Sequence, residues 1–218
     1  MELLPLYLSA LVLGTAHALE PDHMAAVTTF VVRRPRPLQA ALFGARWALG
    51  HGAAIFIAGV VVLVLGQTIP DSWTLVLERV VGLAMIGLGI WTVASAPALH
   101  AHEHIHADGT RHAHVHSHAL APSHEHGHAV TAVGLLHGLA GTGSAVALIP
   151  LISLRSPQQG ALYLFLFGIG TAAGMATYAF LAGFLVRRVS DFSVRLARGV
   201  TLTAGLFAIA VGIFWLVR

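Results

Sequence analysis

The chain has 218 residues, of which 56% are hydrophobic and only 10% are charged. Soluble domains carry about a quarter charged residues, so this composition excludes a soluble globular protein and predicts an all-α integral membrane protein. The formal net charge of +3 rests on arginine without lysine, and no basic stripe interleaved with aromatic residues indicates nucleic-acid binding. Because the chain has no cysteine, disulfides and thiolate metal sites are excluded.

Six apolar segments follow one another along the chain and predict six transmembrane helices. Their approximate ranges are 3–32, 40–67, 75–96, 129–152, 159–186 and 196–217. The first is longer than the roughly 20 residues that cross a bilayer, so we expect it to be tilted or broken at Pro21. The proline ring clashes with the backbone of the preceding helical turn. A signal peptide ending at Ala18 is the alternative for its first half, but Glu2 and the lack of a preceding positive charge disfavour it.

The centre of the first segment carries His17, Glu20, Asp22 and His23. A carboxylate at that depth costs several kcal/mol unless it is paired, hydrated or coordinated. In an unbroken helix His17 and His23 would lie on different faces, whereas a break at Pro21 lets them converge with Asp22. Imidazole and carboxylate together suit Ni²⁺, Co²⁺, Cu²⁺, Zn²⁺ or Fe²⁺. We therefore expect a divalent-metal site here; the alternative is that the segment ends earlier and the charges lie in an aqueous loop.

His51 lies in the second apolar segment, between Gly50 and Gly52. A single histidine in such a segment either forms a hydrogen bond between helices or binds a ligand, and both interpretations stay open from the sequence. We include His51 among the candidate metal ligands.

A hydrophilic linker, residues 97–128, separates the third and fourth segments. Its histidines are His100, His102, His104, His106, His112, His114, His116, His118, His124, His126 and His128. Histidine alternating with small residues cannot form a core, so the linker is predicted to be a disordered, accessory metal-binding tract. A pH-sensing role is the alternative, because histidine titrates near neutrality.

The two halves of the chain, residues 1–96 and 129–218, resemble each other at a shift of about 120 residues. The aligned runs include 14–19 with 134–139 and 50–53 with 170–173. Each half holds three spans, and an odd number inverts the second half relative to the first, as in secondary transporters whose sites lie near the midplane between repeats. We therefore expect a 3+3 inverted repeat in which His137 matches His17 and joins the candidate ligands. Chance similarity between helices rich in glycine and alanine is the alternative.

The arginines predict the orientation of the helices. One side of the membrane would receive Arg33, Arg34, Arg36, Arg46, Arg111, Arg187, Arg188, Arg195 and Arg198, and the other Arg79, Arg155 and Arg218. The arginine-rich side is expected to be cytoplasmic. In a cytoplasmic (inner) membrane the linker would then lie inside the cell and both termini outside.

The run His17-Ala18-Leu19-Glu20-Pro21-Asp22-His23 has the form His-x4-Asp-His and resembles the signature of the nickel/cobalt permeases (the NiCoT and NicO group). The six-span layout and the run His137-Gly138-Leu139-Ala140-Gly141 resemble the UreH-like urease-accessory membrane proteins of that superfamily. The His-rich linker is similar to that of RcnA-type efflux proteins. The resemblance implies transport of Ni²⁺ or Co²⁺, with His17, Asp22 and His23 as functional positions. The acidic second signature of the eight-span importers is not visible in this chain.

We therefore expect a secondary transporter for divalent transition-metal ions, with nickel and/or cobalt as the expected metals, and not an enzyme. The metal would be the substrate, no prosthetic group is implied, and the lipid bilayer and a cytoplasmic metallochaperone are the candidate partners. One alternative is an exporter of a small organic solute or anion with a sensing linker. Another is an intramembrane metalloprotease, for which only Glu20 is available as the base.

Overall fold

The structure is a computed structural model that describes residues 3–33, 35–65, 70–98, 100–105, 111–116, 127–140 and 156–218. Its helices are α1 (Leu3–His17), α2 (Pro21–Val31), α3 (Pro37–Leu65), α4 (Asp71–Ser95), the 3-10 turn η1 (Ala96–Ala98), α5 (Gly127–Ala140), α7 (Pro157–Phe192) and α8 (Val194–Val217). Its strands are β1 (His100–Ile105) and β2 (Arg111–His116). The apolar part is all-helical, which confirms the predicted class.

Four of these helices, α3, α4, α7 and α8, are long and apolar enough to cross a membrane, and the bent pair α1–α2 makes a fifth span if it is counted as one. The predicted fourth segment begins with the shorter apolar helix α5, and its remainder, residues 141–152, lies outside the described residues. The described chain therefore supports a multi-pass membrane protein with four or five spans. Large apolar side chains cover its outer surface, Leu49 (64% exposed) and Leu83 (60% exposed) among them, as a lipid-facing surface requires.

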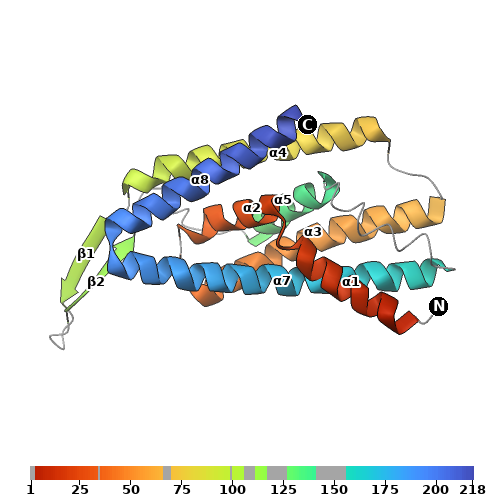
Figure 1. Cartoon of the computed structure of the whole chain (residues 1–218), viewed down its shortest axis with the longest axis horizontal. Coiled ribbons are helices and arrows are strands. Elements are labelled where there is room, and N and C mark those ends of the chain that lie inside the picture. Colours follow the sequence, from red (N-terminus) through yellow and green to blue (C-terminus); the bar gives the residue numbers. More distant parts are fainter. Residues whose placement is uncertain are drawn as a thin grey trace.

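Helices α2 and α5 lie between two pairs of long helices. Figure 1 shows α4 beside α8 and α3 beside α7, with α2 and α5 in the space between the pairs. The first predicted segment is broken as expected: α1 ends at His17, α2 begins at Pro21, and the two are bent by 55°. Proline is tolerated at the first position of a helix because its missing N–H would be unpaired there, so the same residue ends one helix and starts the next.

Glycines let the backbones approach closely where the short helices pack. A Cβ atom on Gly14 of α1 would collide with the carbonyl oxygen of Phe167 on α7, and one on Gly134 of α5 would collide with that of Trp47 on α3. Each of these glycines precedes a histidine by three residues, His17 and His137 respectively. The close contacts thus fix the depth at which both histidines enter the bundle.

The linker differs from its prediction. The structure pairs β1 with β2 as an antiparallel hairpin at one end of the bundle (Figure 1), with His100, His102 and His104 in register with His116, His114 and His112. The sequence predicted disorder, yet alternation of histidine with another residue is also the period of a β-strand. His106, His118, His124 and His126 lie outside the described residues, and His128 falls within α5.

Candidate metal centre

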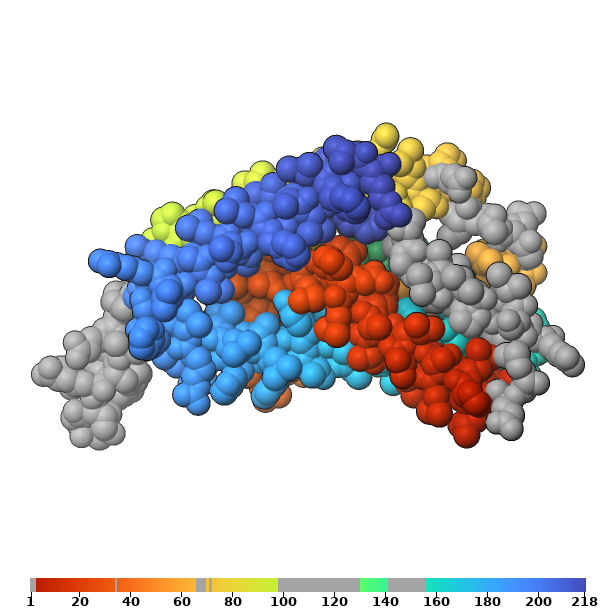
Figure 2. Space-filling view, viewed as in Figure 1, coloured from red at the N-terminus to blue at the C-terminus, as the bar shows by residue number. Residues whose placement is uncertain are grey.

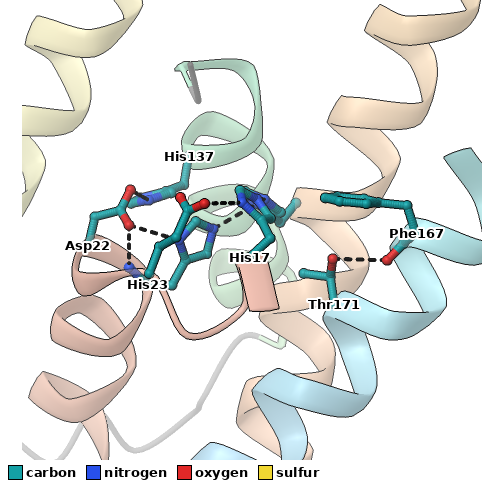
Figure 3. Close-up of polar contacts among 8 residues, drawn as sticks. His17, Asp22, His23, His137, Phe167 and Thr171 are labelled. Carbon is teal, nitrogen blue, oxygen red and sulfur yellow. Dashed lines mark hydrogen bonds and ion pairs between the residues drawn. The ribbon is translucent and has the colours of Figure 1, made fainter. Parts of the chain in front are cut away.

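All four histidines outside the linker meet at one point in the bundle. His17 ends α1, His23 lies in α2, and His137 lies in the last turn of α5 (Figure 3). His51 lies in α3. Each is at least 95% buried. Because the four side chains come from four helices, their convergence is a property of the tertiary packing and not of spacing along one helix.

The meeting point lies at the middle of the membrane-spanning part. His51 is equidistant from the ends of α3, Pro37 and Leu65, which places it about 21 Å from either end at 1.5 Å per residue. His17 and His137 lie at or near the C-terminal ends of their helices, where the helix dipole favours a cation. The cluster therefore lies at the level of the midpoint of α3.

Three imidazole Nε2 atoms face one another. The Nε2 atom of His51 lies 2.9 Å from that of His17 and 3.3 Å from that of His23. Two nitrogens bound to one tetrahedral ion at 2.0–2.1 Å would lie about 3.4 Å apart, close to the separation from His23 and about 0.5 Å longer than that from His17. The three ligand atoms lie within 4.8 Å of one another, so a single ion could contact all of them after small side-chain adjustments.

Asp22 holds two of the histidines. One carboxylate oxygen accepts from the backbone N–H of His23 at 2.9 Å and lies 2.9 Å from Nδ1 of the same residue. The other oxygen lies 3.1 Å from Nε2 of His137. When His23 donates its Nδ1–H to this carboxylate, its Nε2 carries the lone pair and faces His17 and His51. Asp22, His23 and His137 form a second group of neighbouring ligand atoms, which shares His23 with the first group.

Glu20 approaches the cluster from outside. Its Oε1 lies 3.0 Å from Nδ1 of His17, on the ring edge away from the three Nε2 atoms, and its side chain is 38% exposed while that of His17 is 3% exposed. Glu20 belongs to neither group of neighbouring ligand atoms. All six residues predicted for the membrane site are thus brought together, but they occupy different positions in it.

Aromatic rings form the walls of the site, and the sequence analysis did not find them. Trp47 stacks on His51, with ring centroids 5.0 Å apart and planes inclined by 11°, and it also contacts His23 and His137. Phe167 lies against His17 with centroids 5.3 Å apart. Nδ1 of His51 has no hydrogen-bond partner among the described residues, so its ring is positioned by this stacking and by the contacts of its Nε2. One sequence signal was available: Trp47 lies one helical turn before His51 and therefore on the same face of α3.

The second half of the chain contributes less to the site. Thr171 of α7 occupies the position that the 120-residue shift matches with His51, and it is fully buried. Its hydroxyl donates to the carbonyl oxygen of Phe167 in its own helix at 3.0 Å and not to the histidines (Figure 3). Of the residues that the structure describes in this half, His137 alone supplies a ligand atom to either group.

Comparison with known proteins agrees with this architecture. A family model described as the cytochrome C biogenesis protein transmembrane region matches residues 8–207. The urease accessory protein UreH of Bacillus sp. (strain TB-90) is 28% identical over 99% of this chain and 92% of its own length. A Methanocaldococcus jannaschii protein whose name describes a nickel/cobalt efflux system is 29% identical over 79% of this chain and 73% of its own length.

A chloroplast protein of Arabidopsis thaliana, FOR GROWTH AND FERTILITY 2, is 27% identical over 92% of this chain. The chain spans about half the length of that relative, 53%. No solved structure matches the chain. None of the relatives' names describes an enzyme, in agreement with the expectation from the sequence.

Proposed function

The chain belongs to the cytochrome C biogenesis protein transmembrane region family, and from that premise we propose that it is a secondary transporter for divalent transition-metal ions, with nickel or cobalt as cargo. The observation that carries the proposal is the convergence of three buried Nε2 atoms at the midpoint of a membrane helix. The resemblance to the nickel/cobalt transporter superfamily, taken from the His-x4-Asp-His run, is confirmed by the relatives. The name of the Methanocaldococcus jannaschii relative is the reason for preferring nickel and cobalt over zinc, copper or iron.

The donor set suits a cargo ion that must bind and leave. Three neutral imidazoles hold a borderline transition-metal ion but add no net charge. The carboxylate of Asp22 supplies one negative charge beside them and fixes which nitrogen of His23 is free. Such a site would bind the ion in the bilayer centre, where a hydrated cation is unstable, without thiolates that would hold it permanently. His17, His23 and His51 are the proposed ligands, with Asp22 and His137 next to them and Glu20 at the edge.

The proposed frame is six spans in a 3+3 inverted repeat, and paired helix contacts support it. Gly14 contacts the Phe167 carbonyl, and Gly134 contacts the Trp47 carbonyl. The 120-residue shift matches Gly14 with Gly134 and Trp47 with Phe167, so the two contacts are equivalent under the repeat. The contact of Gly50 with Thr131 becomes that of Gly170 with Leu11 in the same way. A pseudo-two-fold axis relating the two halves would produce such exchanged pairs, which supports the repeat over chance similarity of small residues.

The crossing of α4 and α8 supports the same axis. Gly82 packs against the carbonyl of Gly212, and Gly89 packs against that of Gly205. A shift of 123 residues matches Gly82 with Gly205 and Gly89 with Gly212. The two contacts exchange with each other under the proposed repeat, as expected if the axis passes between these two helices. The second half would then be inverted, and the ion site would lie near the midplane between the halves.

The proposed orientation puts the hairpin end of the bundle in the cytoplasm and both termini outside. The C-terminal part of α7 and the start of α8 lie at that end (Figure 1), and their arginines Arg187, Arg188, Arg195 and Arg198 are exposed. Arginine in short loops favours the cytoplasmic side. Three pairs of opposed histidine positions in the hairpin would receive or deliver the ion there, with a metallochaperone as candidate partner.

Transport by purified protein in vesicles tests the proposal. We expect Ni²⁺ or Co²⁺ flux, followed with a metal-sensitive dye inside the vesicles, to be lost in His51→Ala. Leu49→Ala, two residues away on the lipid-facing side of the same helix, is the matched control and should keep its flux. Flux that persists in a correctly folded His51→Ala protein, or a wild-type protein that moves none of the metals, contradicts the proposal.

A further inference from the structure

Glu20 is the exposed member of an otherwise closed cluster. Its side chain is 38% exposed, whereas those of His17, Asp22, His23 and His137 are between 1% and 7% exposed. Glu20 touches His17, and His17 touches His51 at the midpoint of α3, so this carboxylate lies at the depth of the bilayer centre. A carboxylate at that depth is costly against lipid tails and is tolerated where water or protein surrounds it.

The backbone beside Glu20 independently indicates that water or protein surrounds this part of the chain. In the break between α1 and α2, the amide of Leu19 donates to Ala16 and that of Glu20 to His17, so the chain turns tightly. Within the described part of the chain, the carbonyl oxygens of Ala18 and Leu19 accept no backbone hydrogen bond. Irregular backbone is found at membrane depth where it is buried in protein or lines a water-filled cavity.

The break also lies on the surface of the molecule. Figure 2 shows α1 and α2 on the visible face, where α2 lies between α7 and α8, α1 lies over α7, and the two meet near the middle of the long axis. Leu19 is 49% exposed there. Water, or a second copy of the chain, would therefore have to cover this face at the bilayer centre.

We propose that Glu20 and the α1–α2 break line a water-filled mouth through which the cation enters the site and is passed to His17. This inference rests on the proposed transport function. It favours water over a second copy because no other polar member of the site reaches the surface among the described residues, and a packed subunit would close this route. Glu20 then attracts the cation and is not a lasting ligand, since it faces Nδ1 of His17 and not the Nε2 atoms.

Cysteine labelling tests the mouth directly, because the chain has no cysteine of its own. Leu19→Cys places a thiol beside Glu20, and Leu49→Cys places one at the depth of His51 on a surface that faces lipid. A charged, membrane-impermeant thiosulfonate reacts with thiolate, which forms in water and not in lipid, so we expect the first to react at least about tenfold faster. Equally slow labelling of full-length Leu19→Cys and Leu49→Cys proteins in membranes overturns the proposal of a water-filled mouth.

A second copy over this face predicts a different outcome. Leu19→Cys would then form a disulfide-linked dimer under mild oxidation and stay unlabelled, and this result also overturns the mouth. A labelling rate at Leu19→Cys that falls when Ni²⁺ or Co²⁺ is added supports the mouth, since a cation held at His17 would block the reagent.

Transport kinetics separate an entry role from a structural one. Glu20→Gln keeps the size of the side chain and removes the charge that concentrates cations, so flux at low metal should fall roughly threefold to tenfold while flux at saturating metal is kept. Equal losses at both concentrations, or no loss, contradict the entry role. If the wild-type chain carried no metal at all, the transport proposal would fail, and labelling at Leu19→Cys would still decide whether the mouth exists.

Discussion

Asp22→Asn tests whether this carboxylate orients the ligands or is itself a ligand. Asp22 accepts from the backbone N–H of His23 and contacts ring nitrogens of His23 and His137 at 2.9 and 3.1 Å. An asparagine of the same shape offers one acceptor and one NH₂ donor, so it cannot accept from both rings. If the asparagine oxygen still accepts from His23, its NH₂ group faces Nε2 of His137. That nitrogen must then act as an acceptor, so His137 must change tautomer.

The magnitude follows from this geometry. The three Nε2 atoms of His17, His23 and His51 remain, so binding should be weakened and not abolished. Loss of a partner that orients a metal-ligating histidine typically costs about 10- to 100-fold in affinity, or about 1.4–2.7 kcal/mol. We expect the dissociation constant for Ni²⁺ to rise by that factor.

The assay is Ni²⁺ titration of purified protein in which a Gly/Ser linker replaces residues 100–126 and serine replaces His128, so that linker imidazoles do not compete. Asp191→Asn makes the same substitution at an exposed position paired with Arg187 and is the matched control. A loss as large as that of His51→Ala would show that Asp22 is itself a ligand. An unchanged dissociation constant would refute the orienting role.

Three further predictions concern the walls of the site and the hairpin. Gly134→Leu should lower the free energy of unfolding by about 1–3 kcal/mol or more, because its side chain meets the Trp47 carbonyl, whereas Gly87→Leu, with open space around it, should change thermal stability little. Co²⁺ or Ni²⁺ binding should quench the fluorescence of Trp47, so Trp47→Phe should lose most of the quenching and the exposed Trp73→Phe should keep it; equal quenching in both variants would place the ion elsewhere. Replacing the histidines of 100–116 by serine should change the efficiency or regulation of transport while saturating flux in vesicles persists, and abolished flux would assign the hairpin to the transport step.

The helix break is a feature that local sequence predicts correctly in this chain. Pro21 predicts it from the sequence, because proline has no N–H to donate to the preceding turn and its ring clashes with the carbonyl of that turn, and α1 and α2 meet there at 55°. The linker shows the opposite case. Its histidine alternation excludes a core but is compatible with both disorder and a strand, and the pairing of β1 with β2 decides between them.

The sequence by itself determined the membrane class, because only a lipid surface tolerates so many apolar side chains on the outside of the fold. It also restricted the candidate ligands to imidazole and oxygen, since no cysteine is present, and it picked out the four histidines of the apolar segments. Only the tertiary structure decided that three of them face one another through Nε2, that Asp22 holds the rings and that Glu20 stands at the surface. The physical reason is that sequence spacing sets neighbours along one helix, whereas distances between four helices depend on how closely their backbones approach at residues such as Gly14 and Gly134.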